Sequence, residues 1–261
     1  MDLGLTGKRA VVTGASKGIG LNVARTLAAE GVHVVAGSRK SSEELKQLVA
    51  SGHASDVQID LASPAGPSQL IQAALDGGPI DILINNAGAV TPRTGGSVSV
   101  TDEQWANSLN LTLMAAVRTA RAALPGMIEA GRGSIVNTAS VNASLPDPLV
   151  IDYSASKAAL VNFSKALSKE VGPNGIRVNT VSPGPVETDL WLGNEGVAST
   201  LSSTLGGKPT DYQAEAVRGT ATGRFTTPQE VADLIVFLAS DRSANITGTD
   251  YIVDGGLTQS L

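Results

Sequence analysis

What the 261-residue chain lacks narrows the chemistry it can perform. It contains no cysteine, which excludes disulfides, thiol catalysis and thiolate metal sites. His33 and His53 are its only histidines, so we expect no multi-histidine metal centre and assign no metal ligands. Charged residues make up 16% and apolar residues 42% of the chain. This balance favours a well-packed globule that hides part of its surface, for example in an oligomer.

The sequence also lacks the features of a membrane span or a secretory signal. Its most apolar helical stretch, residues 109–128, is interrupted by Arg118, Arg121 and Pro125. Residues 2–14 have no basic region followed by a long apolar run. The net charge of −5 argues against nucleic acid as a partner. We therefore expect a cytoplasmic enzyme that binds neither nucleic acid nor membrane.

Short apolar, β-branched runs alternate along the chain with longer segments of helical periodicity. Such alternation predicts parallel strands joined by crossover helices. We expect a single α/β domain over residues 1–261, with a Rossmann-type, doubly wound, mostly parallel seven-stranded sheet and helices on both faces. The expected strands are 9–14, 33–38, 56–61, 80–88, 134–140, 176–184 and 248–256. The expected helices are 20–31, 42–51, 68–77, 101–113, 113–130, 152–172 and 228–240.

Residues 187–224 show no strong period. A structureless segment of this length is either disordered or functional in most domains. Its glycines suggest movement, so we expect a lid over the substrate, with help from residues 89–96 and 141–150. Packing of its apolar side chains on the body or on a neighbouring subunit is an open alternative. Those side chains are Trp191, Leu192, Val197, Leu201, Leu205 and Tyr212.

A glycine-rich loop, TGASKGIG at residues 13–20, joins the first expected strand to the first expected helix. Glycines at such a junction allow a tight turn, close approach of a pyrophosphate and close helix–sheet packing. The spacing of Gly14, Gly18 and Gly20 is G-x-x-x-G-x-G rather than the more familiar G-x-G-x-x-G. A plain strand–helix turn would look similar, so the loop by itself is weak evidence for a dinucleotide.

Tyr153 and Lys157 stand four residues apart in IDYSASKAALVNFSKAL, one helical turn along the same face. One interpretation is an exposed aromatic ring beside a solvated charge. The other is chemical: a lysine ammonium stabilises a phenolate and lowers the tyrosine pKa from its ordinary value of about 10. A tyrosine tuned in this way could donate or accept a proton during a reaction.

Six short motifs occur in one order over essentially the whole chain, and together they resemble the classical group of the short-chain dehydrogenase/reductase family. They are TGASKGIG (13–20), NNAG (85–88), Asn110 in NLTL, Ser140 in NTAS, YSASK (153–157) and PGPVET (183–188). The pattern is most similar to that of 3-oxoacyl-carrier-protein reductases. The resemblance implies an NAD(P)-dependent oxidoreductase on a Rossmann-type sheet that forms tetramers or dimers.

The resemblance also implies a catalytic group of Asn110, Ser140, Tyr153 and Lys157. Tyr153 would protonate a carbonyl oxygen or deprotonate an alcohol, while Ser140 would hydrogen-bond the same oxygen. Lys157 would hold the nicotinamide ribose hydroxyls, and Asn110 would anchor a water that relays protons to Lys157. The nicotinamide would carry the hydride.

The end of the second expected strand indicates which nicotinamide cofactor is used. An NAD enzyme places a carboxylate there to bind the ribose 2′-hydroxyl. Here the strand ends in Ser38 and Arg39, a hydroxyl and a guanidinium that suit a 2′-phosphate, and Lys17 adds a second positive charge. Arg39 and Lys40 as ordinary surface residues are the alternative. We expect NADP(H) rather than NAD(H).

Further contacts with the cofactor follow from the resemblance, with Asp60 and Leu61 beside the adenine and Val186 and Thr188 at the carboxamide. A turn role for Asp60 and a purely structural role for the NNAG asparagines remain open. The expected cofactor-binding residues are Gly14, Ser16, Lys17, Gly18, Ile19, Gly20, Ser38, Arg39, Asp60, Leu61, Asn85, Asn86, Ala87, Gly88, Tyr153, Lys157, Pro183, Gly184, Val186 and Thr188.

The expected activity is NADP(H)-dependent interconversion of a ketone or aldehyde and an alcohol. An NAD-dependent alcohol dehydrogenase and a non-catalytic cofactor sensor on the same fold are the alternatives. Arg132 is the only basic residue in the segments 128–134 and 172–175, which weakens the case for an acidic carrier protein. By resemblance, helices 101–130 and 152–172 would pair across a two-fold axis, and the last strand with residues 255–261 would complete a homotetramer.

Overall fold

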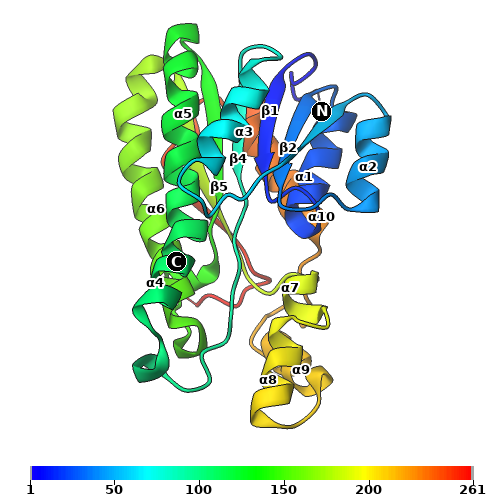
Figure 1. Cartoon of the computed structure of the whole chain (residues 1–261), viewed down its shortest axis with the longest axis vertical. Coiled ribbons are helices and arrows are strands. Elements are labelled where there is room, and N and C mark those ends of the chain that lie inside the picture. The colour runs from blue at the N-terminus through cyan, green and yellow to red at the C-terminus, as the bar shows by residue number, and fades with distance from the viewer. Residues whose placement is uncertain (1, 260–261) are drawn as a thin grey trace.

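A parallel seven-stranded sheet forms the centre of the protein, which we describe from a computed structural model of residues 2–259 (Figure 1). The strand order is β3-β2-β1-β4-β5-β6-β7. The strand order reverses between β1 and β4, so the carboxyl ends of these strands flank a switch point where open α/β sheets bind ligands. The strands are β1 (Arg9–Thr13), β2 (His33–Ser38), β3 (Ala54–Gln58), β4 (Ile82–Asn85), β5 (Gly133–Thr138), β6 (Ile176–Pro183) and β7 (Asp250–Val253).

Helices cover both faces of the sheet, as the sequence predicts. The alternation of side chains along a strand explains the two cores: Ala10 and Val12 of β1 pack on one face and Val11 on the other. The first core includes α1 (Gly18–Ala29), α2 (Glu43–Ala50) and α10 (Pro228–Ala239). The second includes α3 (Gly66–Leu75), α5 (Ala115–Ala130) and α6 (Ile151–Val171), and α4 (Asp102–Leu109) packs on α6.

Most element boundaries lie within two residues of the expected ones. β4 (expected 80–88) and β7 (expected 248–256) are shorter than expected, and two further differences concern β3 and the helices near residue 113. β3 covers 54–58 rather than 56–61, although the Ile59 amide still donates to the Ser38 carbonyl at 2.8 Å. The helices expected to meet at residue 113 are instead one continuous helical run, because a π-helical turn (Asn110–Met114) joins α4 to α5. A π-turn inserts one residue without breaking the helix, so periodicity alone does not reveal it.

Residues 187–224 contain three helices: α7 (Asp189–Leu192), α8 (Val197–Leu205) and α9 (Pro209–Arg218). Glycines at the ends of short helices hide their period in the sequence. Gly206 and Gly207, with φ of +85° and +80°, separate α8 from α9 in a conformation that favours glycine. The three helices lie beyond the carboxyl ends of the strands (Figure 1).

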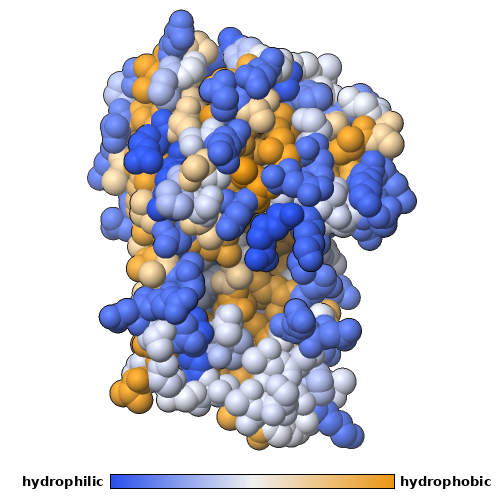
Figure 2. Space-filling view, in the orientation of Figure 1, coloured by the Kyte–Doolittle hydropathy of each residue, from blue (hydrophilic) through white to orange (hydrophobic). Residues whose placement is uncertain are grey.

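In the space-filling view the surface is hollowed between the sheet and these helices, and apolar residues lie at the floor of the hollow (Figure 2). Within residues 2–259, no helix is both long and apolar enough to cross a membrane. Of the tail expected to take part in subunit contacts, Ser260 and Leu261 lie outside the described residues.

Candidate active site

A cleft of about 1340 Å³ opens at the carboxyl ends of the strands and continues toward α7 and α8. Most of the residues expected in the site line it. They are Gly14, Ser16, Lys17, Gly18, Ile19, Ser38, Arg39, Asp60, Leu61, Asn86, Ala87, Gly88, Ser140, Tyr153, Lys157, Pro183, Gly184, Val186 and Thr188. Gly20, Asn85 and Asn110 do not line the cleft.

The glycine loop between β1 and α1 is shaped by its three glycines. Gly14 and Gly18 have φ of +66° and +56°, where side chains other than glycine are strained. A Cβ on Gly20 would lie 2.3 Å from the Gly14 carbonyl oxygen, so Gly20 serves close packing rather than ligand contact. The loop therefore brings backbone to the cleft at the start of α1, where backbone N–H groups favour an anion.

The NNAG segment divides between a structural and a cleft-facing role. Asn85 is buried: its amide donates to the Asn137 side chain at 2.9 Å, and its carbonyl accepts from Thr119 at 2.6 Å. The Asn86 amide donates to the carbonyls of Thr13 and Gly14 and so holds the glycine loop. The structural interpretation therefore holds for Asn85, whereas residues 86–88 line the cleft.

At one end of the cleft, positive and hydroxyl groups follow β2. Arg39 and Lys40 are exposed there, and Ser41 and Ser42 line the cleft beside them. The Ser41 hydroxyl is buried and has no hydrogen-bond partner among the described residues. Sequence reasoning missed Ser41, although it follows Arg39 by two residues. A buried hydroxyl without a partner beside two cations fits a phosphate, which would accept its hydrogen bond.

Two expected cofactor contacts differ in detail. The Ser38 hydroxyl donates to the Lys40 carbonyl at 3.0 Å, so it shapes this turn. Lys17 pairs with Asp189 of α7 at 3.3 Å, with both side chains about two-thirds exposed. Lys17 thus reaches across the cleft, whereas we expected it to stand beside Arg39. Asp60 accepts from the Ala62 amide at 3.0 Å, which is the turn role that the sequence left open, while it also lines the cleft.

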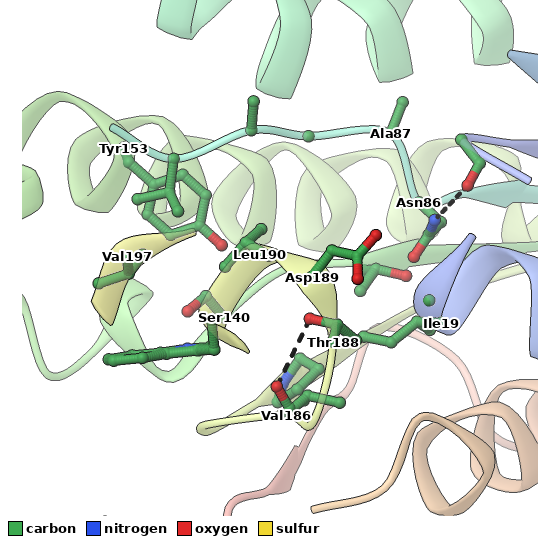
Figure 3. Close-up of a pocket in the computed structure, with 18 of the residues that line it drawn as sticks. Ile19, Asn86, Ala87, Ser140, Tyr153, Val186, Thr188, Asp189, Leu190 and Val197 are labelled. Carbon is green, nitrogen blue, oxygen red and sulfur yellow. Dashed lines mark hydrogen bonds between the residues drawn. The ribbon is translucent and has the colours of Figure 1, made fainter. Parts of the chain in front are cut away.

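At the other end, Ser140 and Tyr153 point their hydroxyls into the cleft (Figure 3). Ser140 follows β5 and accepts a hydrogen bond from the Asn142 amide at 3.2 Å, which holds its side chain. Tyr153 and Lys157 lie one turn apart on α6, with the lysine ammonium 5.5 Å from the centre of the tyrosine ring. Lys157 is 3% exposed and donates to the Thr138 carbonyl at 2.6 Å.

Burial sets the protonation of this pair. It raises the pKa of Tyr153 to about 12, and hydrogen bonding with Ser140 lowers that pKa by a smaller amount. It lowers the pKa of Lys157 to about 7. The expectation that Lys157 lowers the tyrosine pKa is therefore wrong for this arrangement, because loss of hydration penalises the charged form of each group. Tyr153 is held as a protonated phenol at neutral pH.

Asn110 begins the π-turn and lies outside the cleft. Its side-chain oxygen accepts a hydrogen bond from the Arg118 guanidinium at 3.1 Å. Another nitrogen of the same guanidinium is buried and has no partner among residues 2–259. The π-turn packs against α6, which carries Tyr153 and Lys157. The structure thus places Asn110 in a turn that packs on α6, with its side chain bonded to Arg118.

A buried ion pair that sequence reasoning missed joins the loop after β4 to the start of α6. Arg93, in the loop after β4, donates to both carboxylate oxygens of Asp152 at 3.2 and 2.6 Å. The side chains are 13% and 3% exposed. The Arg93 amide also donates to the Leu149 carbonyl at 2.6 Å. Because Asp152 precedes Tyr153, this pair fixes the start of α6 against the loop after β4. Arg93 and Asp152 are 59 residues apart, so no local sequence pattern indicates that they pair.

The family model described as enoyl-(acyl carrier protein) reductase matches residues 14–258. A Streptomyces virginiae protein named as a monensin polyketide synthase ketoacyl reductase is 41% identical, over 97% of both chains. A 3-oxoacyl-[acyl-carrier-protein] reductase of Chlamydia pneumoniae is 34% identical, over 99% of this chain and 100% of that protein. The structure of L-sorbose reductase from Gluconobacter frateurii, complexed with NADPH and L-sorbose, has a TM-score of 0.90, 37% identity and full coverage of both chains.

The family match over nearly the whole chain agrees with the fold and with the grouping of Ser140, Tyr153 and Lys157 in one cleft. Relatives of similar length with more than 30% identity span the entire sheet rather than a shared fragment. The chain is therefore a member of the short-chain dehydrogenase/reductase family of NAD(P)-dependent oxidoreductases.

Proposed function

We propose that the protein is an NADPH-dependent reductase that interconverts a ketone or aldehyde and the corresponding alcohol. One observation carries the proposal. One end of the cleft is lined by the side chains of Ser140, Tyr153 and Lys157. The other end is lined by Arg39, Lys40 and Ser41, whose buried hydroxyl has no hydrogen-bond partner among residues 2–259. The NADPH complex of L-sorbose reductase, a close structural relative, supports the same assignment.

The residues around the cleft fit this cofactor. Arg39, Lys40 and Ser41 would hold the 2′-phosphate, and the loop at 14–18 would hold the pyrophosphate. No carboxylate stands at the end of β2, where an NAD enzyme binds the ribose hydroxyls. When bound, NADPH supplies the hydride.

The chain's own residues supply proton transfer and orientation. Tyr153 is a protonated phenol whose hydroxyl points into the cleft, so it can donate a proton to a carbonyl oxygen. Ser140 would donate a hydrogen bond to the same oxygen as negative charge develops there. Lys157, held by the Thr138 carbonyl, would bind the nicotinamide ribose, and Asn110 would support α6 from behind.

Two alternative functions predict different cofactor binding and turnover. An NAD-dependent alcohol dehydrogenase would bind NADH more tightly than NADPH. A cofactor sensor would bind cofactor without turnover, and it has no need of a protonated phenol beside a serine.

Fluorescence titration with NADPH and NADH, followed by a carbonyl panel read at the nicotinamide absorbance, tests the proposal. We expect tight NADPH binding, weak NADH binding and ketone reduction. Tyr153→Phe is expected to retain NADPH binding and to lose at least about 100-fold in kcat, because general acid catalysis is removed. Tyr251→Phe, in β7 and outside the cleft, is the matched control. Binding of neither cofactor would overturn the proposal.

We further propose that residues 187–224 act as a lid on a single domain of residues 1–261, and that the enzyme is a cytoplasmic homotetramer. The apolar residues Trp191, Val197 and Leu201 line the cleft, which supports the lid. The expected residues Leu192, Leu205 and Tyr212 do not line the cleft: Leu205 is 55% exposed, and Tyr212 donates to the Gly206 carbonyl.

A further inference from the structure

The part of the cleft next to Ser140 and Tyr153 has an apolar wall. Figure 3 shows Leu190 and Val197 in the same part of the cleft as the Ser140 and Tyr153 hydroxyls. Trp191 is held by an edge-to-face contact with Phe225, with ring centres 6.0 Å apart. The residues of this apolar wall are Leu145 and Leu149 from the loop before α6, and Leu190, Trp191, Val197 and Leu201 from α7 and α8.

Part of the apolar wall is exposed to solvent inside the cleft. Leu145 is 46% exposed and Leu190 is 38% exposed, although both line the cleft. Exposed apolar side chains that converge on a reactive group favour an apolar ligand, because its binding removes their surface from water.

The charges around the cleft are divided between its two ends. The basic lining residues Lys17, Arg39 and Lys40 belong to the glycine loop and the end of β2. Near the apolar wall, the charged lining residues of loops 141–150 and 184–191 are carboxylates, Asp147, Glu187 and Asp189. Lys157 stands beside Tyr153 and is bonded to the Thr138 carbonyl.

Arg93 directly follows the lining residue Pro92, but its side chain is committed elsewhere. Both of its donor groups that face Asp152 are bonded to that carboxylate, in a pair that is almost fully buried. A substrate carboxylate or phosphate would therefore meet three carboxylates at this end. Among the described residues only Asp189 of these forms an ion pair, with the largely exposed Lys17 at 3.3 Å, so binding of an anion here is unfavourable.

We propose that the substrate is an uncharged, largely apolar ketone that reacts free in solution, rather than an anionic keto acid or a thioester carried on a phosphorylated or acidic carrier. This inference rests on the proposed reductase function and names its substrate class. The polar contact it requires is confined to the carbonyl oxygen, which the Ser140 and Tyr153 hydroxyls would bind.

A pair of substrates that share an acyl group but differ in charge tests the proposal with wild-type enzyme and saturating NADPH. Ethyl 3-oxohexanoate is neutral, 3-oxohexanoate is an anion with the same 3-oxohexanoyl group, and 3-oxohexanoyl-CoA adds phosphates. We expect kcat/KM for the ester to exceed that for the acid and for the CoA thioester by at least about 10-fold, the scale of one favourable group in a pocket. 2-Tetralone should likewise exceed L-sorbose, a polyhydroxy ketone. Equal or better turnover of the acid, the CoA thioester or L-sorbose would overturn the inference.

A charge introduced into the apolar wall gives a second, independent measurement. Leu145→Arg is expected to raise the acid-to-ester ratio of kcat/KM by about 10-fold, because it supplies the missing cation. Val98→Arg, at a position that is 97% exposed and outside the cleft, should leave the ratio unchanged. The NADPH dissociation constant of each variant verifies folding. NADPH binding without turnover of any ketone would instead refute the proposed function, so the two failures are distinct.

Discussion

Lys157 and Tyr153 show how strongly burial governs single residues in this site. Their spacing predicted a charged lysine that makes the phenol more acidic. Instead the pKa of Tyr153 is raised and that of Lys157 is lowered, so burial favours the uncharged form of each group. The cause is local, because Lys157 is only 3% exposed and the ammonium donates its hydrogen bond to an uncharged group, the Thr138 carbonyl. The residue types could be read from the sequence, but their hydration depends on the packing of β5 and α6 around them.

The buried lysine predicts how stability depends on pH. With a pKa of about 7 in the folded protein, Lys157 releases its proton there, while the unfolded chain holds it until about pH 10.5. Between these values the unfolded state binds more protons, so stability rises with pH. From about pH 7 to about pH 9.5, Lys157 contributes a rise of about 3 kcal/mol. The window stops below the titration of Tyr153, whose raised pKa has the opposite effect above about pH 10.

Urea unfolding across this pH range, compared between wild type and Lys157→Met, isolates the contribution of Lys157. We expect the methionine variant to gain most relative to wild type near pH 7 and to lose this advantage toward pH 9.5. Lys165→Met removes an exposed lysine of the same helix and should leave the pH slope of wild type intact. Parallel pH curves for wild type and Lys157→Met would show that the buried lysine keeps an ordinary pKa.

Elements differ in how far sequence pattern could place them. The seven strands and the long helices were predicted because buried strands form short apolar runs and amphipathic helices repeat apolar residues at helical spacing. The helices α7, α8 and α9 were missed because they are only four to ten residues long and glycines stand at their ends. The Arg93–Asp152 pair was missed because it joins a loop to the start of α6, and pairing between distant residues leaves no local pattern.

That ion pair yields a prediction for the helix it holds. Asp152→Asn weakens the contact between the loop at 89–96 and α6, which positions Tyr153. We expect kcat to fall by about 10-fold with the NADPH dissociation constant unchanged, because small misplacements of catalytic groups are costly. Arg93→Lys keeps the positive charge but loses the forked geometry, so its kcat should lie between that of wild type and that of Asp152→Asn. Activity is measured per NADPH-binding site, which corrects for any loss of folded protein.

Arg132→Gln is the matched control for this element. It removes another arginine–carboxylate pair, with Asp81 at 3.2 Å, outside the cleft. A drop in melting temperature for Asp152→Asn with wild-type kcat per site would mean that the pair stabilises the fold without positioning Tyr153.

At the scale of the whole molecule, the sheet ends in an edge that is open in one chain. Strand β7 pairs only with β6 among the described residues, and its Ile252 is 43% exposed. Exposed apolar edge strands are normally covered, because their free backbone groups invite pairing. The layer of α4, α5 and α6 is a second candidate surface, on which Ile128 is 43% exposed. Two separate surfaces of this kind are what a tetramer built from two dimer contacts requires.

Sedimentation velocity at micromolar concentration tests this arrangement. We expect wild type to sediment with four times the 26.5 kDa chain mass. Ile252→Lys places a charge on the β7 edge, where charge opposes pairing, and should reduce the assembly to dimers held by the helical layer. Leu205→Lys alters an apolar, 55% exposed position on α8, which packs on α7 and α9 rather than on either surface, and should leave the tetramer intact. A wild-type monomer would overturn the tetramer, whereas an Ile252→Lys tetramer would exclude the β7 edge as a subunit contact.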